Sequence, residues 1–448
     1  MEAGNSRRTF PLACNNDTER DSRSLYSLQS SPTSISNCPI DTPEKCWNRS
    51  KIIFSRHNSF INGSKASIKS SFSNVSFDTK RTEINWQNDL TLSENTDFTV
   101  GINHRKTDAS ITGFSTFDGD ITNNAIYANM LNHKGKFNLD LSGRYDDHSQ
   151  AGGEFTGQVA TGYSFTPNTT AYISYGTAFR APNINDLYNP GSPSFSDPTV
   201  FQFAGNPDLK PETSKSFEVG LKADFPESNL RVNLAAHHTI TEDFQSNVFI
   251  GNGFALQNAG DYEADGIEVE SLWIPIQGTR LLLAYSYTDA VFKTFEQGPC
   301  WSSTPWQTGT PDPKQQFLPN GAPAPYCDRS GDRPYTQPKT KGVLTLEQEF
   351  SLSDDIYSYV AIEFSYVGDI YTEASGDEIA LIDARNAINA RVFFNLEEYD
   401  MDIVLWGRNI GDDAELSSQS LAAPLQQGKL LNFYKEPATY GVSVKKRF

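Results

Sequence analysis

The sequence predicts an all-β fold, a transmembrane antiparallel β-barrel, from two observations. First, apolar and polar residues alternate along most of the 448 residues, and side chains of a strand point alternately to opposite faces. Second, many alternating segments are about ten residues or longer. Strands of soluble proteins average about 5–6 residues, whereas membrane-crossing strands need about 9–11. One face of such strands suits lipid and the other suits water.

The alternation predicts about seventeen strands. In the segment that begins at Phe137, Leu139 and Leu141 continue an apolar face, while Asn138 and Asp140 are polar. Comparable segments begin near residues 51, 65, 80, 96, 124, 153, 169, 216, 230, 254, 279, 340, 355, 386, 400 and 440. The charged residues expected to line the lumen include Asp140, Arg144, Glu218, Lys222, Arg231 and Arg391.

The connections between strands are sorted by length. Short turns lie at 167–170, 226–229, 275–278, 352–355 and 397–400, and long polar loops lie at about 109–123, 180–213, 292–339, 370–386 and 411–438. Membrane barrels have short turns at the periplasmic end and long loops at the outer end, whereas propellers and sandwiches do not sort their loops in this way. The pattern therefore favours a membrane barrel.

The two ends of the chain lead to different expectations. A strand at 51–61 that runs inward would place residues 1–50, a Cys-containing segment rich in Ser and Asn, on the long-loop side. Because bacterial barrels start in the periplasm with an even strand number, we expect a barrel that lacks its first strands. In the final strand, Tyr440, Val442, Val444 and Phe448 share the apolar face.

Composition excludes several classes of protein. The net charge of −18 argues against nucleic-acid binding, which needs a basic surface. No apolar run approaches the roughly 20 residues of a membrane helix. The sequence contains no HExxH, Gly-x-Ser-x-Gly or phosphate-loop motif, and Asp118 and Asp120 lack the spacing of a calcium loop. We therefore expect that the protein is not an enzyme and that it has no cofactor and no metal site.

All five cysteines lie in polar loop-like stretches. Cys300 and Cys327 are the most plausible disulfide pair, in an oxidising compartment, with unpaired thiols as the alternative. The sequence leaves open how Cys14, Cys38 and Cys46 pair.

Several stretches resemble the TonB-dependent outer-membrane receptors of Gram-negative bacteria. These are "AYISYGTAFRAPNINDLY" (171–188), "GNPDLKPETSKSFEVGLK" (205–222), "NAGDYEADGIEVE" (258–270) and "RNIGDDAE" (408–415). The terminal "YGVSVKKRF" resembles the signal that the barrel-assembly machinery reads. Together these stretches cover most of residues 65–448 in the family's order.

The resemblance implies a 22-stranded barrel, closed by an N-terminal plug that carries the motif contacting TonB. Residues 51–448 would supply about 16–17 of those strands, without the plug, and residues 1–50 a loop-like segment. It further implies import of a scarce metal chelate, either a ferric siderophore or cobalamin. The lipid of the outer membrane and the TonB complex would be its other partners.

Aromatic residues in the long loops are candidates for ligand contact, because their rings can stack on flat organic chelates. The opposing interpretation is that these rings pack on one another or form an interfacial girdle. The candidates are Tyr188, Phe201, Phe203, Trp301, Trp306, Tyr326 and Tyr335.

Two other classes of protein compete with an importer. A passive porin or a structural barrel would share the strands, but long aromatic loops suit capture better than diffusion. A soluble all-β binding protein would need its apolar faces buried in a dry core. A barrel hydrolase is the least favoured alternative.

Overall fold

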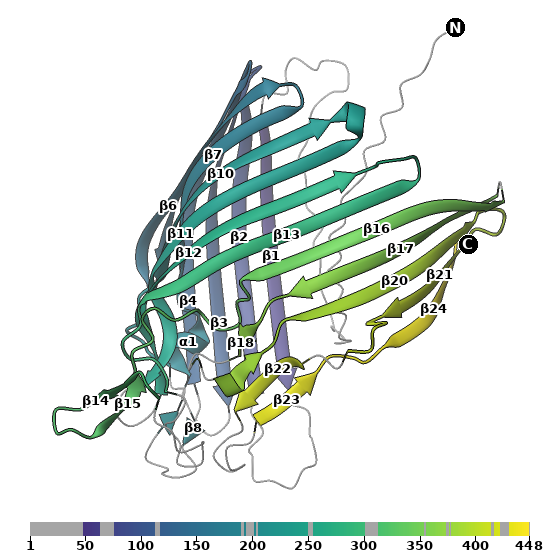
Figure 1. Ribbon diagram of the computed structural model, residues 1–448. Coiled ribbons are helices and arrows are strands. Elements are labelled where there is room, and N and C mark those ends of the chain that lie inside the picture. Colours follow the sequence, from purple (N-terminus) through teal and green to yellow (C-terminus); the bar gives the residue numbers. More distant parts are fainter. Residues whose placement is uncertain are drawn as a thin grey trace.

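The computed structural model describes residues 48–62, 76–112, 117–189, 192–193, 201–202, 205–249, 254–300, 312–353, 355–372, 376, 378–413, 416–421 and 430–447. These residues form one large antiparallel sheet with short elements at one end (Figure 1). Strands β1–β4 lie behind β10–β13 in this view, so the sheet curls strongly (Figure 1). The prediction of an all-β antiparallel architecture is confirmed.

Sixteen strands follow one another in the sheet in chain order, each paired with its neighbours along the sequence. The first eight are β1 (Asn48–Asn62), β2 (Ser76–Ser93), β3 (Thr96–Thr112), β4 (Phe117–Lys134), β5 (Phe137–His148), β6 (Gly152–Thr166), β7 (Thr169–Arg180) and β10 (Glu212–Phe225). The last eight are β11 (Leu230–Phe249), β12 (Phe254–Trp273), β13 (Thr279–Thr294), β16 (Thr340–Ser353), β17 (Ile356–Val367), β20 (Arg385–Leu396), β21 (Met401–Arg408) and β24 (Thr439–Lys446).

Short secondary-structure elements lie in the connections between these strands. Among the described residues, four two-stranded sheets and one helix, α1 (Ile184–Tyr188), lie at the long-loop end. The pairs are β8 (Ser192–Pro193) with β9 (Phe201–Gln202), β14 (Gln315–Phe317) with β15 (Pro323–Cys327), β18 (Ile370–Tyr371) with β19 (Leu381–Ile382), and β22 (Leu416–Leu421) with β23 (Leu430–Tyr434). The 3-10 turns are η2 (Pro226–Ser228), η3 (Glu378–Ala380) and η4 (Glu397–Tyr399). In the described part of the chain, no helix has the length and apolar character needed to cross a membrane.

The register places apolar side chains in continuous rows on one face of the sheet. Residues paired across neighbouring strands share a face, so each row can be followed from strand to strand. One row across seven strands consists of Leu90, Phe98, Met130, Leu141, Val159, Tyr175 and Phe217. Many side chains of this face are exposed, for example Phe155 at 71% and Ile126 at 55%. The apolar face is therefore uncovered.

The opposite face carries the polar alternate positions and several ion pairs between them. Arg144 lies beside Asp146, and Arg391 contacts Glu347 at 3.0 Å. Two small clusters of buried apolar residues lie at the long-loop end, one around α1 and one around Phe292 and Phe295. The described part thus has local cores under its loops.

The predicted direction of the first strand is wrong. β1 pairs directly with β2, with Asn48 opposite Leu90 and Asn62 opposite Ser76. Because Leu90 lies near the tight β2–β3 turn, β1 begins at the short-turn end. The sequence analysis counted a further strand near residue 65, in a stretch outside the described residues. Because neighbouring strands of an antiparallel sheet run in opposite directions, counting one more strand between β1 and β2 reversed the direction predicted for β1. Residues 1–47, including Cys14, Cys38 and Cys46, also lie outside the described residues.

The long loop expected at 109–123 is largely strand. β3 continues to Thr112 and β4 begins at Phe117. Polar residues occupy these strand ends, with Asp108 paired with Asp120 in the ladder and Lys106 contacting Asp120 at 3.5 Å. The polar composition of these residues therefore marks strand ends that extend past the rows of apolar side chains. It does not mark an irregular backbone.

Candidate functional site

Helix α1 begins where the chain leaves β7 at the long-loop end. The side-chain oxygen of Asn183 accepts hydrogen bonds from the backbone N–H groups of Asn185 and Asp186, at 2.8 and 3.0 Å. The Asp186 carboxylate accepts one in return from the backbone N–H of Asn183, at 3.0 Å. This capping box provides hydrogen-bond partners for backbone N–H groups at the start of a five-residue helix, which have no partner within the helix.

The apolar side of α1 is packed onto the sheet. Ile184 and Leu187 are buried together with Ile121 of β4 and Leu209, and Leu187 is only 1% exposed. Burial of four aliphatic side chains fixes the helix against the polar face of β4. α1 is thereby held over the mouth of a cavity.

Two of the stretches that resemble the receptor family meet beside α1. Arg180 of "FRAP" pairs with Glu212 of "PE" at 2.9 Å, and its guanidinium lies 3.8 Å from Asp186. The Glu212 carboxylate also accepts a hydrogen bond from the backbone N–H of Gln245, at 2.6 Å. These residues hold the return of the loop into β10, as structural residues rather than as ligand contacts.

Gly205 allows the two loop segments to touch. A Cβ at this position would lie 2.6 Å from the backbone nitrogens of Tyr188 and Asn189. The Gly205 N–H donates to the Asn189 carbonyl at 2.8 Å, and the Asn206 N–H donates to the Asp186 carbonyl at 2.9 Å. Any side chain here would separate the loop from α1.

A cavity of about 960 Å³ lies below α1, lined by the long-loop ends of β2–β7 and by residues 181–185 and 189. Its charged lining residues are Arg81, Arg105, Arg144 and Asp146. The arginines come from β2, β3 and β5, and the ladders place all four residues on the same face of the sheet. The cavity is therefore a polar chamber at the long-loop end.

The wall of this cavity contains a fully buried polar group. The Asp146 side chain is 2% exposed and accepts hydrogen bonds from Arg144 Nε and Nη2, both at 2.7 Å. Asn123 Nδ2 donates to the same carboxylate at 2.7 Å. These charge-assisted hydrogen bonds fix the orientation of the Arg144 guanidinium group and of the Asn123 side-chain amide.

His148 lies in the same wall with a defined orientation. Its Nδ1 accepts hydrogen bonds from the backbone N–H groups of Gln150 and Ala151, at 3.4 and 3.1 Å. The neutral ring therefore carries its proton on Nε2, which is a donor.

Arg81, Arg105, Asn123, Asp146 and His148 were not among the predicted ligand-contact residues. Each occupies a polar alternate position of its strand, which the sequence shows. The ladder between strands, which the sequence does not show, brings them together.

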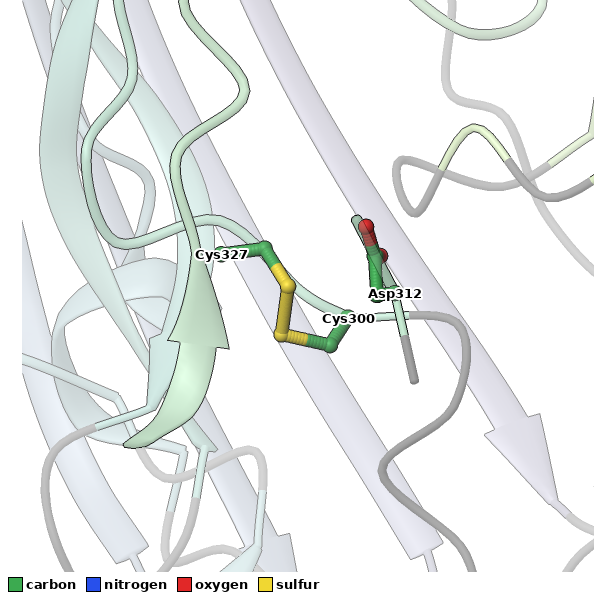
Figure 2. Close-up of side chains that lie close together, drawn as sticks. All are labelled: Cys300, Asp312 and Cys327. Atoms are coloured by element: carbon green, nitrogen blue, oxygen red, sulfur yellow. A yellow bond between two sulfur atoms is a disulfide. The ribbon is translucent and has the colours of Figure 1, made fainter. Parts of the chain in front are cut away.

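A second loop assembly consists of residues 295–300 and 312–339. A disulfide joins Cys300 and Cys327, with a Cα–Cα distance of 5.2 Å, and it is the pair favoured by the sequence. Asp312 lies close to both sulfur atoms (Figure 2). Because the sulfurs are bonded to each other and Asp312 is ion-paired with Arg329, these three residues are committed to holding the loop.

Buried ion pairs and aromatic packing complete this second assembly. Arg329, 3% exposed, also donates from Nε to the Pro299 carbonyl at 2.9 Å. Phe292 and Phe295 pack with ring centroids 5.0 Å apart. Hydrogen bonds from Ser330 hold the pKa of the Asp328 carboxyl below its ordinary value.

The predicted aromatic ligand contacts do not form one group in the described structure. Tyr188 is half-buried and packs against the apolar cluster of α1. Tyr326 and Tyr335 are half-buried in the second assembly. Phe201 is a residue of β9, but its side chain, like Phe203, Trp301 and Trp306, lies outside what the structure describes.

The last strand has the two faces expected from the sequence. Tyr440, Val442 and Val444 pair with Gly407, Leu405 and Ile403 on the apolar face, and they are 61–68% exposed. Phe448 lies outside the described residues.

Comparison with known proteins identifies the family. The family model for the TonB dependent receptor-like beta-barrel matches residues 15–410. The vitamin B12 transporter BtuB of Photobacterium profundum is 34% identical over 143 residues, which is 32% of this chain and 22% of that protein. BtuB of Vibrio vulnificus is 32% identical over 201 residues, 43% of this chain and 30% of that protein. The matches thus cover less than a third of these relatives' own length.

Solved receptor structures share the fold. The ferric yersiniabactin uptake receptor FyuA of Yersinia pestis superposes with a TM-score of 0.61 at 13% identity, covering 89% of this chain and 58% of that one. The FrpB iron transporter of Neisseria meningitidis gives 0.62 at 11% identity, covering 90% and 60%. These matched proteins are transporters and receptors and not enzymes. Since the family model covers most of its length, the chain belongs to the TonB-dependent receptor β-barrel family.

Proposed function

We propose that this chain forms the barrel wall of a receptor that imports a scarce metal chelate, a ferric siderophore or cobalamin, across the outer membrane of a Gram-negative bacterium. The observation that carries the proposal is the polar cavity under α1 at the long-loop end. A chamber of this size with a charged and an apolar wall suits capture of an organic chelate. The names of the matched proteins, vitamin B12 transporter and ferric yersiniabactin uptake receptor, are in line with these substrate classes.

The uncovered apolar rows support placement in a lipid bilayer. In the described part of the chain, exposed residues such as Phe155, Ile126 and Phe217 lie on one face and polar alternate positions on the other, without a dry core between two layers. Lipid would cover the apolar face, and the barrel-assembly machinery would recognise the final strand through Tyr440, Val442, Val444 and Phe448.

Energy for import would come from TonB through a plug domain, as in other members of the family. Residues 51–448 would form barrel wall, and residues 1–50 a separate Cys-containing segment. The aromatic residues Tyr188, Phe201, Phe203, Trp301, Trp306, Tyr326 and Tyr335 are proposed to act in the outer loops.

Uptake by living cells tests this function. The full gene that encodes this chain is expressed in a strain deleted for its own ferric-chelate and cobalamin receptors, with and without TonB. We expect saturable, TonB-dependent uptake of a radiolabelled ferric chelate or of cobalamin. Uptake of neither ligand, or equal entry of unrelated small sugars with and without TonB, would instead support a passive porin.

A further inference from the structure

We propose that the cavity under α1 binds an anionic, oxygen-rich part of the imported chelate, so that the substrate is a negatively charged ferric chelate and not a neutral one. This inference rests on the proposed function and narrows it to one substrate class. Three observations carry it: the charge of the lining, the open donors of Arg105, and two fixed polar side chains.

The lining has the opposite charge to the chain as a whole. Three guanidinium groups and one carboxylate line the cavity, and Glu83 pairs with one of these guanidinium groups, so positive charge still exceeds negative charge by one, while the chain carries −18. In a chamber with low-dielectric walls such an excess concentrates anions. Arginine also presents planar, paired donors that match carboxylate and catecholate oxygens.

Arg105 is the arginine whose donors remain open. Arg81 is paired with Glu83 at 2.8 Å, and Arg144 is paired with Asp146 at 2.7 Å. Within the described residues, the Arg105 side chain has neither a hydrogen-bond acceptor nor an ion-pair partner. Its position in the ladder lies between Glu83 and Asn123, in the middle of the cavity wall.

Asn123 and His148 add groups of known orientation. Asn123 is 4% exposed, and its Oδ1 has no donor within hydrogen-bond distance among the described residues, while its Nδ2 is held by Asp146. His148 presents an Nε2–H donor, because its Nδ1 is used by the backbone. A buried acceptor without a donor is costly unless a ligand supplies one. The fitting ligand has anionic oxygens for Arg105 and His148 and an O–H or N–H for Asn123.

The size and the walls of the cavity agree with such a ligand. About 960 Å³ is at the upper end of the range of small-molecule sites, roughly 300–1,000 Å³. Phe179, Pro182 and Ile184 form an apolar side next to the charged one. An organic chelate with a hydrocarbon or aromatic edge and an anionic edge would contact both the apolar and the charged side of the cavity.

Binding to whole cells that express the full gene tests the inference. The probes are a synthetic anionic ferric tris-catecholate, an anionic ferric carboxylate chelate, a neutral ferric trihydroxamate and cyanocobalamin, all radiolabelled. The variants are Arg105→Gln, Arg105→Lys and the matched control Arg231→Gln, which removes a lumen-side arginine at the opposite end of the sheet, where it pairs with Asp224. Surface labelling corrects each affinity for receptor abundance.

We expect an anionic chelate to bind best and Arg105→Gln to weaken that binding about 10- to 100-fold, which corresponds to the loss of a charge-assisted hydrogen bond. Arg105→Lys should retain part of the affinity and Arg231→Gln nearly all of it. Tightest binding of cobalamin or of the neutral trihydroxamate, or an Arg105→Gln variant equal to wild type, overturns the inference and leaves the proposed function intact. Binding of none of the probes overturns the proposed function itself.

Discussion

The two loop assemblies of the long-loop end are fixed by different physical means. Residues 181–189 and 205–211 are held by the apolar underside of α1 and by the partly exposed Arg180–Glu212 pair. Residues 295–300 and 312–339 are held by the Cys300–Cys327 disulfide and the buried Arg329–Asp312 pair. The first assembly contributes lining residues to the cavity, and none of the described lining residues comes from the second.

This difference suggests that the two loop assemblies have different roles. An assembly held by apolar packing can loosen and reseat at modest cost, which suits a segment that roofs a binding chamber. A cross-linked assembly keeps its conformation without help from neighbouring elements, which suits a loop that stands away from the chamber. The predictions below separate the two mechanisms by changing one anchor at a time.

The largest effect is expected from Arg329→Leu. The change leaves the Asp312 carboxylate buried without its ion-pair partner, which destabilises the second assembly by about 3–5 kcal/mol. Amide hydrogen exchange of the β14–β15 hairpin measures this opening. The double variant Arg329→Leu/Asp312→Leu removes both charges and should recover most of the protection; equal exchange in the single and double variants would contradict the role of the ion pair.

Removal of the disulfide ranks next. Replacement of Cys300 and Cys327 by serine frees a loop closed over a sequence separation of 27, a loss of about 3.5 kcal/mol by the chain-entropy relation. Exchange should rise in residues 312–332 and stay unchanged in residues 184–189. A similar rise in both regions would show that the two assemblies are one cooperative unit.

A smaller effect, about 3 kcal/mol, is expected from Leu187→Ala, because it opens a cavity in the apolar cluster under α1. Exchange of residues 184–189 should increase, and the affinity for the chelate should fall. Leu352→Ala is the matched control, since Leu352 is 62% exposed at the short-turn end. Loss of chelate affinity in the control variant would indicate a general folding defect.

The smallest effect is a pH dependence within the second assembly. Hydrogen bonds from the Ser330 hydroxyl and N–H lower the pKa of Asp328 below its ordinary value of 3.8. The stabilisation is therefore present above that ordinary value and is lost as the pH falls through the lower, folded-state pKa. Hydrogen exchange of residues 326–332 should rise only below about pH 4. Asp328→Asn should abolish this acid-dependent part, and an unchanged acid response in the variant would assign it to another group.

Strand prediction from the sequence was accurate where alternation is strict. Phe137–Leu141, Phe217–Leu221 and Tyr440–Val444 show one apolar side chain at every second position, and each lies in a strand of the sheet with that face uncovered. It failed at 109–123, because polarity within a long strand misleads a method that reads one segment at a time. The strand expected near residue 65 lies outside the described residues.

The sequence alone determined where most of the strands lie and which face each of their side chains takes, because a period of two is a property of the local backbone. Only the tertiary structure decided which polar residues meet. Arg81, Arg105, Asn123 and Asp146 come from four strands, and their convergence depends on a register set by pairing across the whole sheet. The polar positions of all these strands look alike in sequence, so no local pattern indicates which of them share a wall.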